Sequence, residues 1–265
     1  MRRNYLALWI LLTTAFAIVV ILSIFGPVTI LGYELKDSGM SKIFWNDTIA
    51  NVEISAVDSV VPFSADSIEA EKPVEVDTTK KTILFFGDSM LDGLYPRLAA
   101  YAEQNGHELY AVIWYSSTSE TWGKSDKLRK YIEQLHPNYI FISLGANELF
   151  VKDIADKRDK YVKNIISDIG DIPYLWIGPP NWKPDTGINS LIERNAAKGS
   201  FFLSDGMTFI RKKDGAHPTS KSSEEWMDSI VRWMPQHSNH PILMEKPDKT
   251  KGKAKRVFVH QPDEK

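Results

Sequence analysis

Short apolar runs and amphipathic segments take turns along residues 82–240. Apolar runs without a polar face, which are typical of strands buried on both sides of a sheet, lie at 82–86, 107–114, 139–144, 174–177 and 201–203. Segments with helical spacing lie between and after them, at 91–103, 126–135, 157–169, 188–197 and 223–234. Strands that alternate with helices in this way predict an α/β domain built on a parallel five-stranded sheet.

The amino terminus carries a different pattern, an uncharged apolar run over residues 5–25. A helix of these 21 residues would span about 31 Å, close to the hydrocarbon thickness of a bilayer. Arg2 and Arg3 precede the run, which places the amino terminus in the cytoplasm and the rest of the chain outside. We therefore expect residues 1–33 to be a cytoplasmic stub and a single-pass transmembrane signal anchor in the inner (cytoplasmic) membrane.

A cleaved signal peptide is the alternative to this anchor. The apolar run is longer than the core of most signal peptides, and residues 23–26 make a poor cleavage site. A retained anchor is therefore favoured, with the main domain in the periplasm or outside the cell.

Two polar segments flank the main domain. Residues 34–81 are rich in Asp, Glu, Ser, Thr and Val without sustained periodicity, which predicts an extended linker. Residues 241–265 are rich in Lys and predict a flexible, solvated tail with weak attraction to anionic polymers or headgroups. The chain is thus expected to consist of an anchor, a linker, a main domain at 82–240 and a tail.

Composition narrows the classes of function. The formal net charge is -2, which argues against nucleic acid as the main partner. The chain has no cysteine, so a thiol nucleophile, a zinc–thiolate site and a disulfide framework are all excluded.

Polar residues suited to acyl transfer follow the first and third predicted strands and recur late in the chain. Gly87-Asp88-Ser89 ends the first strand, residues 145–148 (Gly-Ala-Asn-Glu) follow the third, and residues 214–217 (Asp-Gly-Ala-His) come later. In parallel sheets functional residues gather at the carboxyl ends of the strands. We therefore expect these three segments to converge at one edge of the sheet.

A serine hydroxyl needs a base to become a nucleophile, and the imidazole of that base needs a fixed tautomer. We expect Ser89 to be the nucleophile, His217 the base, and Asp214 the carboxylate that orients the imidazole. The Ser89 backbone N–H and the Asn147 side-chain amide are candidate donors to the oxyanion that ester attack creates. Taken singly, Ser89 also fits a helix cap and Asn147 a loop amide, whereas the three segments together favour catalysis.

In this order the three segments resemble the conserved blocks of the SGNH (GDSL) hydrolase family. The resemblance extends over residues 82–240. It implies a flavodoxin-like three-layer α/β/α fold, with Ser89 as nucleophile, His217 as base and Asp214 as its partner. It also implies that Asn147 belongs to the oxyanion hole, and that no metal and no cofactor take part.

Two positions depart from the family's pattern. The third block usually ends in Asn-Asp, where this chain has Asn147-Glu148, but the amide is the part that the chemistry needs. The second block offers a glycine N–H to the oxyanion; here Ser119 stands at that position, and Gly123 is the glycine nearby. Because a backbone N–H does not require glycine, we favour Ser119 over Gly123.

Residues after the fourth predicted strand extend the expected site. Asn181 and Trp182 should reach the same edge of the sheet and bind substrate, with Trp182 stacked on a sugar or acyl group. Packing in the core or at its rim is an equal alternative for Trp182. The basic run at 211–213 adjoins Asp214. We interpret this run as a solvated loop in preference to a group that attracts an anionic substrate.

The resemblance and the predicted anchor together favour a membrane-tethered serine esterase of the bacterial cell envelope. The preferred substrate is a small ester, an O-acetyl group on envelope carbohydrate, whose acyl group passes to water or to a sugar hydroxyl. A membrane acyltransferase is a candidate partner for such transfer. The alternatives are a lipase, lysophospholipase or thioesterase, and a non-catalytic envelope assembly or binding protein on the same scaffold.

Overall fold

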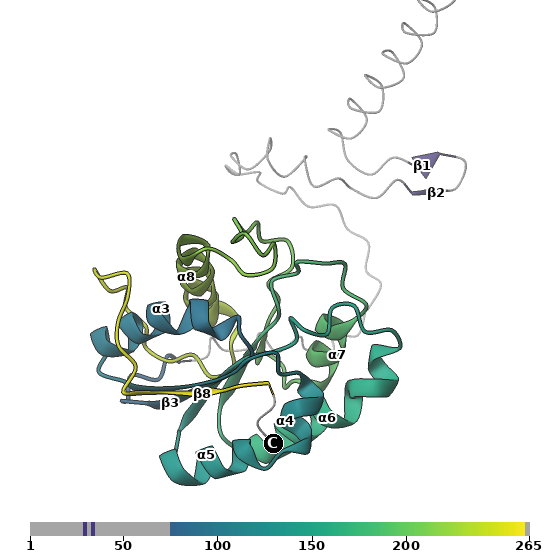
Figure 1. Cartoon of the computed structure of the whole chain (residues 1–265). Coiled ribbons are helices and arrows are strands. Elements are labelled where there is room, and N and C mark those ends of the chain that lie inside the picture. Colours follow the sequence, from purple (N-terminus) through teal and green to yellow (C-terminus); the bar gives the residue numbers. More distant parts are fainter. Residues whose placement is uncertain (1–28, 31–32, 35–74, 263–265) are drawn as a thin grey trace, which may run out of the picture. The chain divides into compact units, whose positions relative to one another are not determined.

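The computed structural model describes residues 29–30, 33–34 and 75–262, and the chain divides into two units, Met1–Ile68 and Glu69–Lys265 (Figure 1). In the first unit, the described residues are the strands β1 (Thr29–Ile30) and β2 (Tyr33–Glu34), which pair antiparallel. The expected anchor and linker otherwise fall outside the described residues, apart from the last few positions of the linker. Within the described part of the chain, no helix has the length and apolar character needed to cross a bilayer.

The second unit is built on a parallel sheet with the strand order β7-β6-β5-β3-β4-β8. Its strands are β3 (Thr82–Gly87), β4 (Glu108–Trp114), β5 (Tyr139–Ser143), β6 (Tyr174–Ile177), β7 (Phe201–Phe202) and β8 (Arg256–His260). The predicted α/β class and parallel sheet are confirmed. The predicted number of five strands is wrong, because β8 adds a sixth strand beside β4.

Helices cover both faces of this sheet. They are α3 (Leu91–Gln104), α4 (Ser119–Lys124), α5 (Lys127–Leu135), α6 (Ile154–Ile169), α7 (Ile188–Asn195) and α8 (Ser220–His237). Figure 1 shows α3 and α8 on one side of the sheet and α4, α5 and α6 on the other. The α4 helix is an element that the apolar spacing did not predict.

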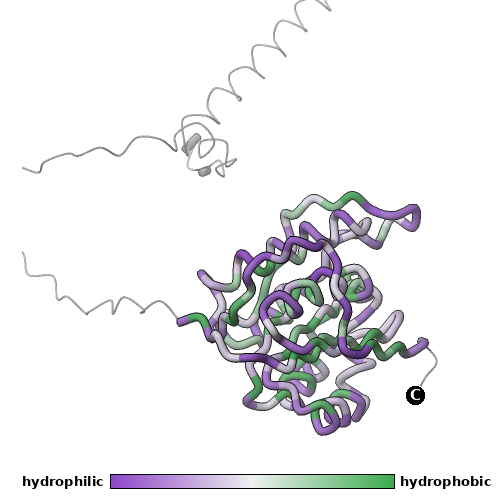
Figure 2. The backbone as a smooth tube through the Cα atoms, turned by 90° about the vertical axis from the view of Figure 1, so that its left-hand side faces the viewer, coloured by the Kyte–Doolittle hydropathy of each residue, from purple (hydrophilic) through white to green (hydrophobic). Residues whose placement is uncertain are grey.

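Alternation along the strands decides which core each side chain joins. Ile83 and Phe85 of β3 pack with residues of α3 and α8, whereas Leu84 and Phe86 pack with residues of α4 to α7. Successive side chains of a strand point to opposite faces, so a strand that is apolar at every position contributes to two cores. Figure 2 shows the resulting hydrophobic interior and the hydrophilic positions around the outside of this unit.

The Lys-rich segment at 241–265, predicted to be a flexible tail, is part of the folded domain as far as residue 262. Residues 245–255, which we call the carboxyl-terminal strap, lie along α3 and lead into β8. The backbone N–H of Gly252 donates to the carbonyl of Pro96 in α3 at 2.8 Å. A Cβ on Gly252 would come within 2.4 Å of the backbone of Ala99 and Ala100, so only glycine allows the strap to lie this close to the helix.

The lysines of the strap have acidic partners in the body of the domain, which explains why a Lys-rich segment folds here. The ion pairs are Lys246–Asp228, Lys249–Glu103, Lys251–Glu224 and Lys255–Glu108. Pairs this exposed contribute little stability individually. The strand that follows supplies more, because Phe258 of β8 packs on Tyr131 of α5 with the ring centroids 4.9 Å apart.

Candidate active site

Three segments meet at the carboxyl ends of β3 and β5 and in front of α8. The first is the turn from β3 into α3, which contains Asp88 and Ser89. The second is the turn that follows β5, at 144–148, and the third is the loop at 203–218 that leads into α8. Gly87 of β3 is in register with Ser143 of β5, so the first two turns start at the same level of the sheet.

Asp88 ties the first two segments together from a fully buried position. Its carboxylate accepts the backbone N–H of Met90 at 2.9 Å and that of Ala146 at 3.3 Å. Burial raises the pKa of Asp88 to about 7, and the backbone donors oppose this rise. Asp88 therefore holds the turn that presents Ser89.

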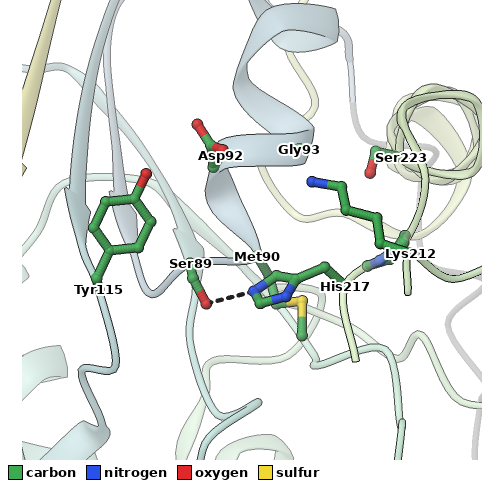
Figure 3. A pocket seen from close by; sticks show the side chains of 9 residues that line it. Ser89, Met90, Asp92, Gly93, Tyr115, Lys212, His217 and Ser223 are labelled. Atoms are coloured by element: carbon green, nitrogen blue, oxygen red, sulfur yellow. Dashed lines mark hydrogen bonds between the residues drawn. The ribbon is translucent and has the colours of Figure 1, made fainter. Parts of the chain in front are cut away.

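Ser89, His217 and Asp214 form one hydrogen-bonded chain, of which Figure 3 shows the bond between Ser89 and His217. His217 Nε2 lies 2.8 Å from Ser89 Oγ, and His217 Nδ1 lies 2.9 Å from Asp214 Oδ2. A carboxylate at Nδ1 favours the tautomer with the proton on Nδ1, which leaves Nε2 to accept from the serine hydroxyl. The structure thus brings together the three side chains that the sequence singled out for nucleophilic catalysis.

The turn from Asp214 to His217 holds the carboxylate in place. Asp214 Oδ1 accepts the backbone N–H groups of His217 and Ala216, both at 2.9 Å, while Oδ2 faces the imidazole. These backbone donors and the His217 ring lower the pKa of Asp214 to about 2. Gly215 makes the turn with a φ of 71°, in the left-handed region that glycine adopts without strain.

The lowered pKa of Asp214 predicts how the stability of the domain depends on pH. The folded pKa of about 2 lies below the ordinary value of 3.8, so the carboxylate stabilises the fold fully at neutral pH. That contribution is lost as the pH falls through 3.8 toward 2. The melting temperatures of the wild type and Asp214→Asn should therefore differ most at neutral pH and converge in acid. Thermal melts between pH 7 and pH 2 test this, and a constant difference would contradict it.

Asn147 lies in the turn after β5 with one amide hydrogen engaged. Its Nδ2 donates to the backbone carbonyl of Ser117 at 2.9 Å, which leaves the second hydrogen of the amide for another acceptor. Within the described part of the chain, no acceptor is hydrogen-bonded to the Ser89 backbone N–H. Both donors that the sequence proposed for an oxyanion are therefore present with hydrogen-bonding capacity.

Neither candidate for a further backbone donor, Ser119 or Gly123, is placed to serve. The Ser119 N–H donates to Glu148 Oε2 at 2.8 Å, and the Ser119 hydroxyl donates to the other oxygen of the same carboxylate at 2.8 Å. Gly123 lies in α4 against α6, where an added Cβ would come within 2.6 Å of the Tyr161 carbonyl oxygen. The prediction that one of them donates to the oxyanion is therefore wrong. The Ser119 N–H is already bonded to Glu148, and Gly123 serves the close packing of α4 on α6.

Glu148 explains why the Ser119 N–H is not free to bind an oxyanion. Its side chain is fully buried, and its carboxylate also accepts from Arg158 Nε at 2.7 Å. Burial raises the pKa of Glu148, and the donors from Ser119 and Arg158 act against that rise. Glu148 therefore does more than follow Asn147: its carboxylate fixes the start of α4.

Asn181 and Trp182, the predicted substrate-binding residues, do not line the pocket beside Ser89. Trp182 Nε1 donates to the Ala146 carbonyl at 2.9 Å, and its ring packs edge-on against Phe150. Asn181 Oδ1 accepts from Asn189 Nδ2 at 3.1 Å. This is a correction: the two side chains support the turn after β5 and the start of α7, which is the packing alternative for Trp182.

The pocket beside Ser89 has a volume of about 180 Å³. Its polar lining includes Ser89, Asp92, Tyr115, Lys212 and His217 (Figure 3). Sequence reasoning did not assign Asp92 or Tyr115 to the site and favoured a solvated loop for Lys212.

Two sequence signals point to these side chains. Tyr115 directly follows β4, at the same end of the sheet as Ser89, and Asp92 lies in the first turn of the helix that Ser89 precedes.

Among the described residues, no three His, Cys, Asp or Glu side chains are grouped so as to hold a metal ion.

Comparisons with known proteins find similarity to solved structures at low sequence identity. No family model matches the sequence, and no curated protein matches it. Among solved structures, the chain is similar to the psychrotrophic esterase EstA from Pseudoalteromonas sp., inhibited by monoethylphosphonate, with 17% identity and a TM-score of 0.43 over 58% of this chain and 96% of the esterase.

A second solved structure is that of the salicylyl-acyltransferase SsfX3 from a tetracycline biosynthetic pathway. The identity is 16% and the TM-score 0.43, over 59% of this chain and 54% of that one, so the chain spans about half of the acyltransferase. Likenesses at this level assign no activity, and the function of this chain is inferred from the geometry of its site.

Proposed function

We propose that this chain is a serine esterase or acyltransferase that acts on small esters through Ser89. The observation that carries the proposal is the continuous hydrogen-bonded chain from Ser89 Oγ through His217 to Asp214 at the edge of a pocket. A serine with only a structural role needs neither an imidazole acceptor nor a carboxylate behind that imidazole. This arrangement supports the resemblance to SGNH hydrolases that the sequence suggested.

The reaction begins when His217 Nε2 takes the proton of Ser89 Oγ as the oxygen attacks the ester carbonyl carbon. The carbonyl oxygen becomes an oxyanion, to which the Ser89 backbone N–H and the second Asn147 amide hydrogen donate. His217 then gives its proton to the leaving alcohol oxygen as the carbon–oxygen bond breaks, which leaves an acyl group on Ser89. Water or a sugar hydroxyl, deprotonated in turn by His217, attacks the acyl-enzyme and restores the serine.

The dimensions and chemistry of the pocket favour a small acyl group on a polar alcohol. At about 180 Å³ the pocket is smaller than the cavities of 300–1,000 Å³ that hold drug-sized ligands. Its lining carries a carboxylate from Asp92, an ammonium from Lys212 and a phenol from Tyr115. These groups can hydrogen-bond to the hydroxyl groups of a carbohydrate, so O-acetylated carbohydrate is the proposed substrate.

The proposed location follows from the sequence. The uncharged run at 5–25 behind Arg2 and Arg3 supports an exported domain anchored in the cytoplasmic membrane. An anchored enzyme of this kind would act on glycans at the outer face of that membrane.

Acyl-chain selectivity tests the proposed function. We expect kcat/KM for 4-nitrophenyl acetate to exceed that for 4-nitrophenyl octanoate by at least about tenfold, because a pocket of this size excludes the longer chain. Initial rates of the full-length chain in detergent, over acetate, butyrate and octanoate esters, measure this. Equal or higher activity on octanoate would support a lipase instead, and no hydrolysis of any ester would support the non-catalytic alternative.

A further inference from the structure

The pocket at Ser89 continues into a second hollow of about 160 Å³ between α3 and α8. The two hollows share the residues Asp92, Gly93, Lys212, Pro218 and Ser223. We call the two together the acceptor groove. Their shared lining makes the groove a path that leads from Ser89 along the start of α3.

The floor of the acceptor groove is a close contact between two helices. A Cβ on Gly93 of α3 would lie 2.5 Å from Ser223 Oγ of α8, and Ser223 is almost completely buried. Figure 3 shows Lys212 extending toward the first turn of α3, with Asp92 on the opposite side of that turn, toward Tyr115. The groove therefore has a rigid base and polar side chains along its rim.

The outer end of the groove adds charged side chains of both signs. Glu224 comes from the first turns of α8, and Lys251 comes from the carboxyl-terminal strap. These two lie 4.0 Å apart, and more than half of the Lys251 side chain is exposed, so both retain capacity for further hydrogen bonds. Arg97 also lines this end, but its guanidinium is buried and donates to Asp228 at 2.6 Å and to the Lys249 carbonyl at 2.7 Å.

Carboxylates and ammoniums in balanced number suit a neutral ligand with many hydroxyl groups. Asp92 and Glu224 accept hydrogen bonds, and Lys212 and Lys251 donate them. An anionic ligand would be favoured by a site of one sign, and a lipid chain by an apolar one. The lining of the groove thus favours an uncharged carbohydrate over an anionic ligand and over a lipid chain.

We propose that the acceptor groove binds the sugar portion of the ester, and that Asp92 and Lys251 determine specificity for it. This inference rests on the proposed function of Ser89 and adds where the alcohol side of the substrate lies. It also explains the strap, since Lys251 directly precedes Gly252, the residue pinned against α3. The Lys-rich end of the chain is built into the fold in a way that holds an ammonium at the end of the groove.

The test compares one sugar ester with one aryl ester in each variant. The readout is the ratio of kcat/KM for 6-O-acetylglucose, which keeps its other hydroxyl groups free, to kcat/KM for 4-nitrophenyl acetate, measured on the full-length chain in detergent. Asp92→Asn and Lys251→Met should each lower this ratio about tenfold, because each removes a charged hydrogen-bonding group from the sugar and not from the acyl group. Lys255→Met is the matched control: Lys255 is in the same strap, pairs with Glu108 at 2.7 Å and lines neither hollow, so its ratio should match the wild type.

Failure of this inference is distinguishable from failure of the proposed function. A wild type that cleaves the aryl ester but releases no acetate from the sugar ester would overturn the groove as a sugar site. Ratios that stay unchanged in both Asp92→Asn and Lys251→Met would do the same, with the esterase left intact. A wild type that cleaves neither ester would instead remove the proposed function on which the groove depends.

Discussion

Ser89→Ala is expected to lower kcat for 4-nitrophenyl acetate by about 10⁴-fold or more and to abolish covalent labelling by a fluorophosphonate. The alanine removes the oxygen that attacks the carbonyl carbon, and it leaves the pocket and the proposed oxyanion donors in place. Serine hydrolases that lose the nucleophile or the base retain only the residual catalysis of binding and oxyanion stabilisation. Gel-based labelling and initial rates measure the two effects independently.

His217→Ala should cause a loss of similar size, because the serine then has no acceptor for its proton. The double variant should be no worse than either single one, since the two side chains act as a unit. Ser229→Ala changes a half-buried serine on α8 whose hydroxyl donates to the Glu225 carbonyl; it is the control and should label like the wild type. Labelling that persists in Ser89→Ala would assign the reactive nucleophile to another residue.

Gly87→Ala is expected to destabilise the domain by about 4 kcal/mol or more, which lowers the melting temperature by about 8–16 °C. Gly87 is the last residue of β3, and a Cβ there would lie 1.9 Å from the carbonyl oxygen of Ser143 in β5. That oxygen also accepts the Asp88 N–H at 2.9 Å, so moving it breaks the bond that starts the Ser89 turn. Thermal melts of the purified variant measure the loss of stability, and residual esterase rates show the displacement of Ser89.

Gly206→Ala separates this clash from the general effect of replacing a glycine. Gly206 has a φ of 83°, and its Cβ position has no neighbour within 4 Å, so alanine there meets backbone strain alone. That strain costs about 1–2 kcal/mol. If the two alanine variants melted at the same temperature, the close approach of β3 and β5 would not be what requires glycine at 87.

Local pattern carried most of the information about the strands and about four of the site residues. Apolar runs that are buried on both faces predicted β3 to β7, and polar residues at strand ends pointed to Ser89 and Asn147. Asp214 and His217 were found because an imidazole and a carboxylate three residues apart can hydrogen-bond within one turn. Each of these signals lies within a short stretch of chain, so a single sequence contains it.

The errors concern contacts between distant segments. A run of lysines predicts solvated chain, and nothing within it records that Asp228, Glu103, Glu224 and Glu108 face it in the fold. Likewise, Ser119 was proposed as an oxyanion donor because it stands at the glycine position of the second block, whereas its N–H donates to Glu148, 29 residues away. Trp182 was placed in the substrate site by its position after a strand, but its indole donates to the turn below.

The sequence by itself determined the α/β class, the order of most elements and the identity of the serine, histidine and aspartate that meet at the edge of the sheet. Those properties follow from hydrophobic periodicity and from the hydrogen-bonding capacity of residues close in the chain. Only the tertiary structure decided the sixth strand, the course of the carboxyl-terminal strap, the engagement of Ser119 by Glu148 and the lining of the acceptor groove. Each of these depends on which groups from remote segments come within hydrogen-bonding distance, and packing of the whole chain sets that proximity.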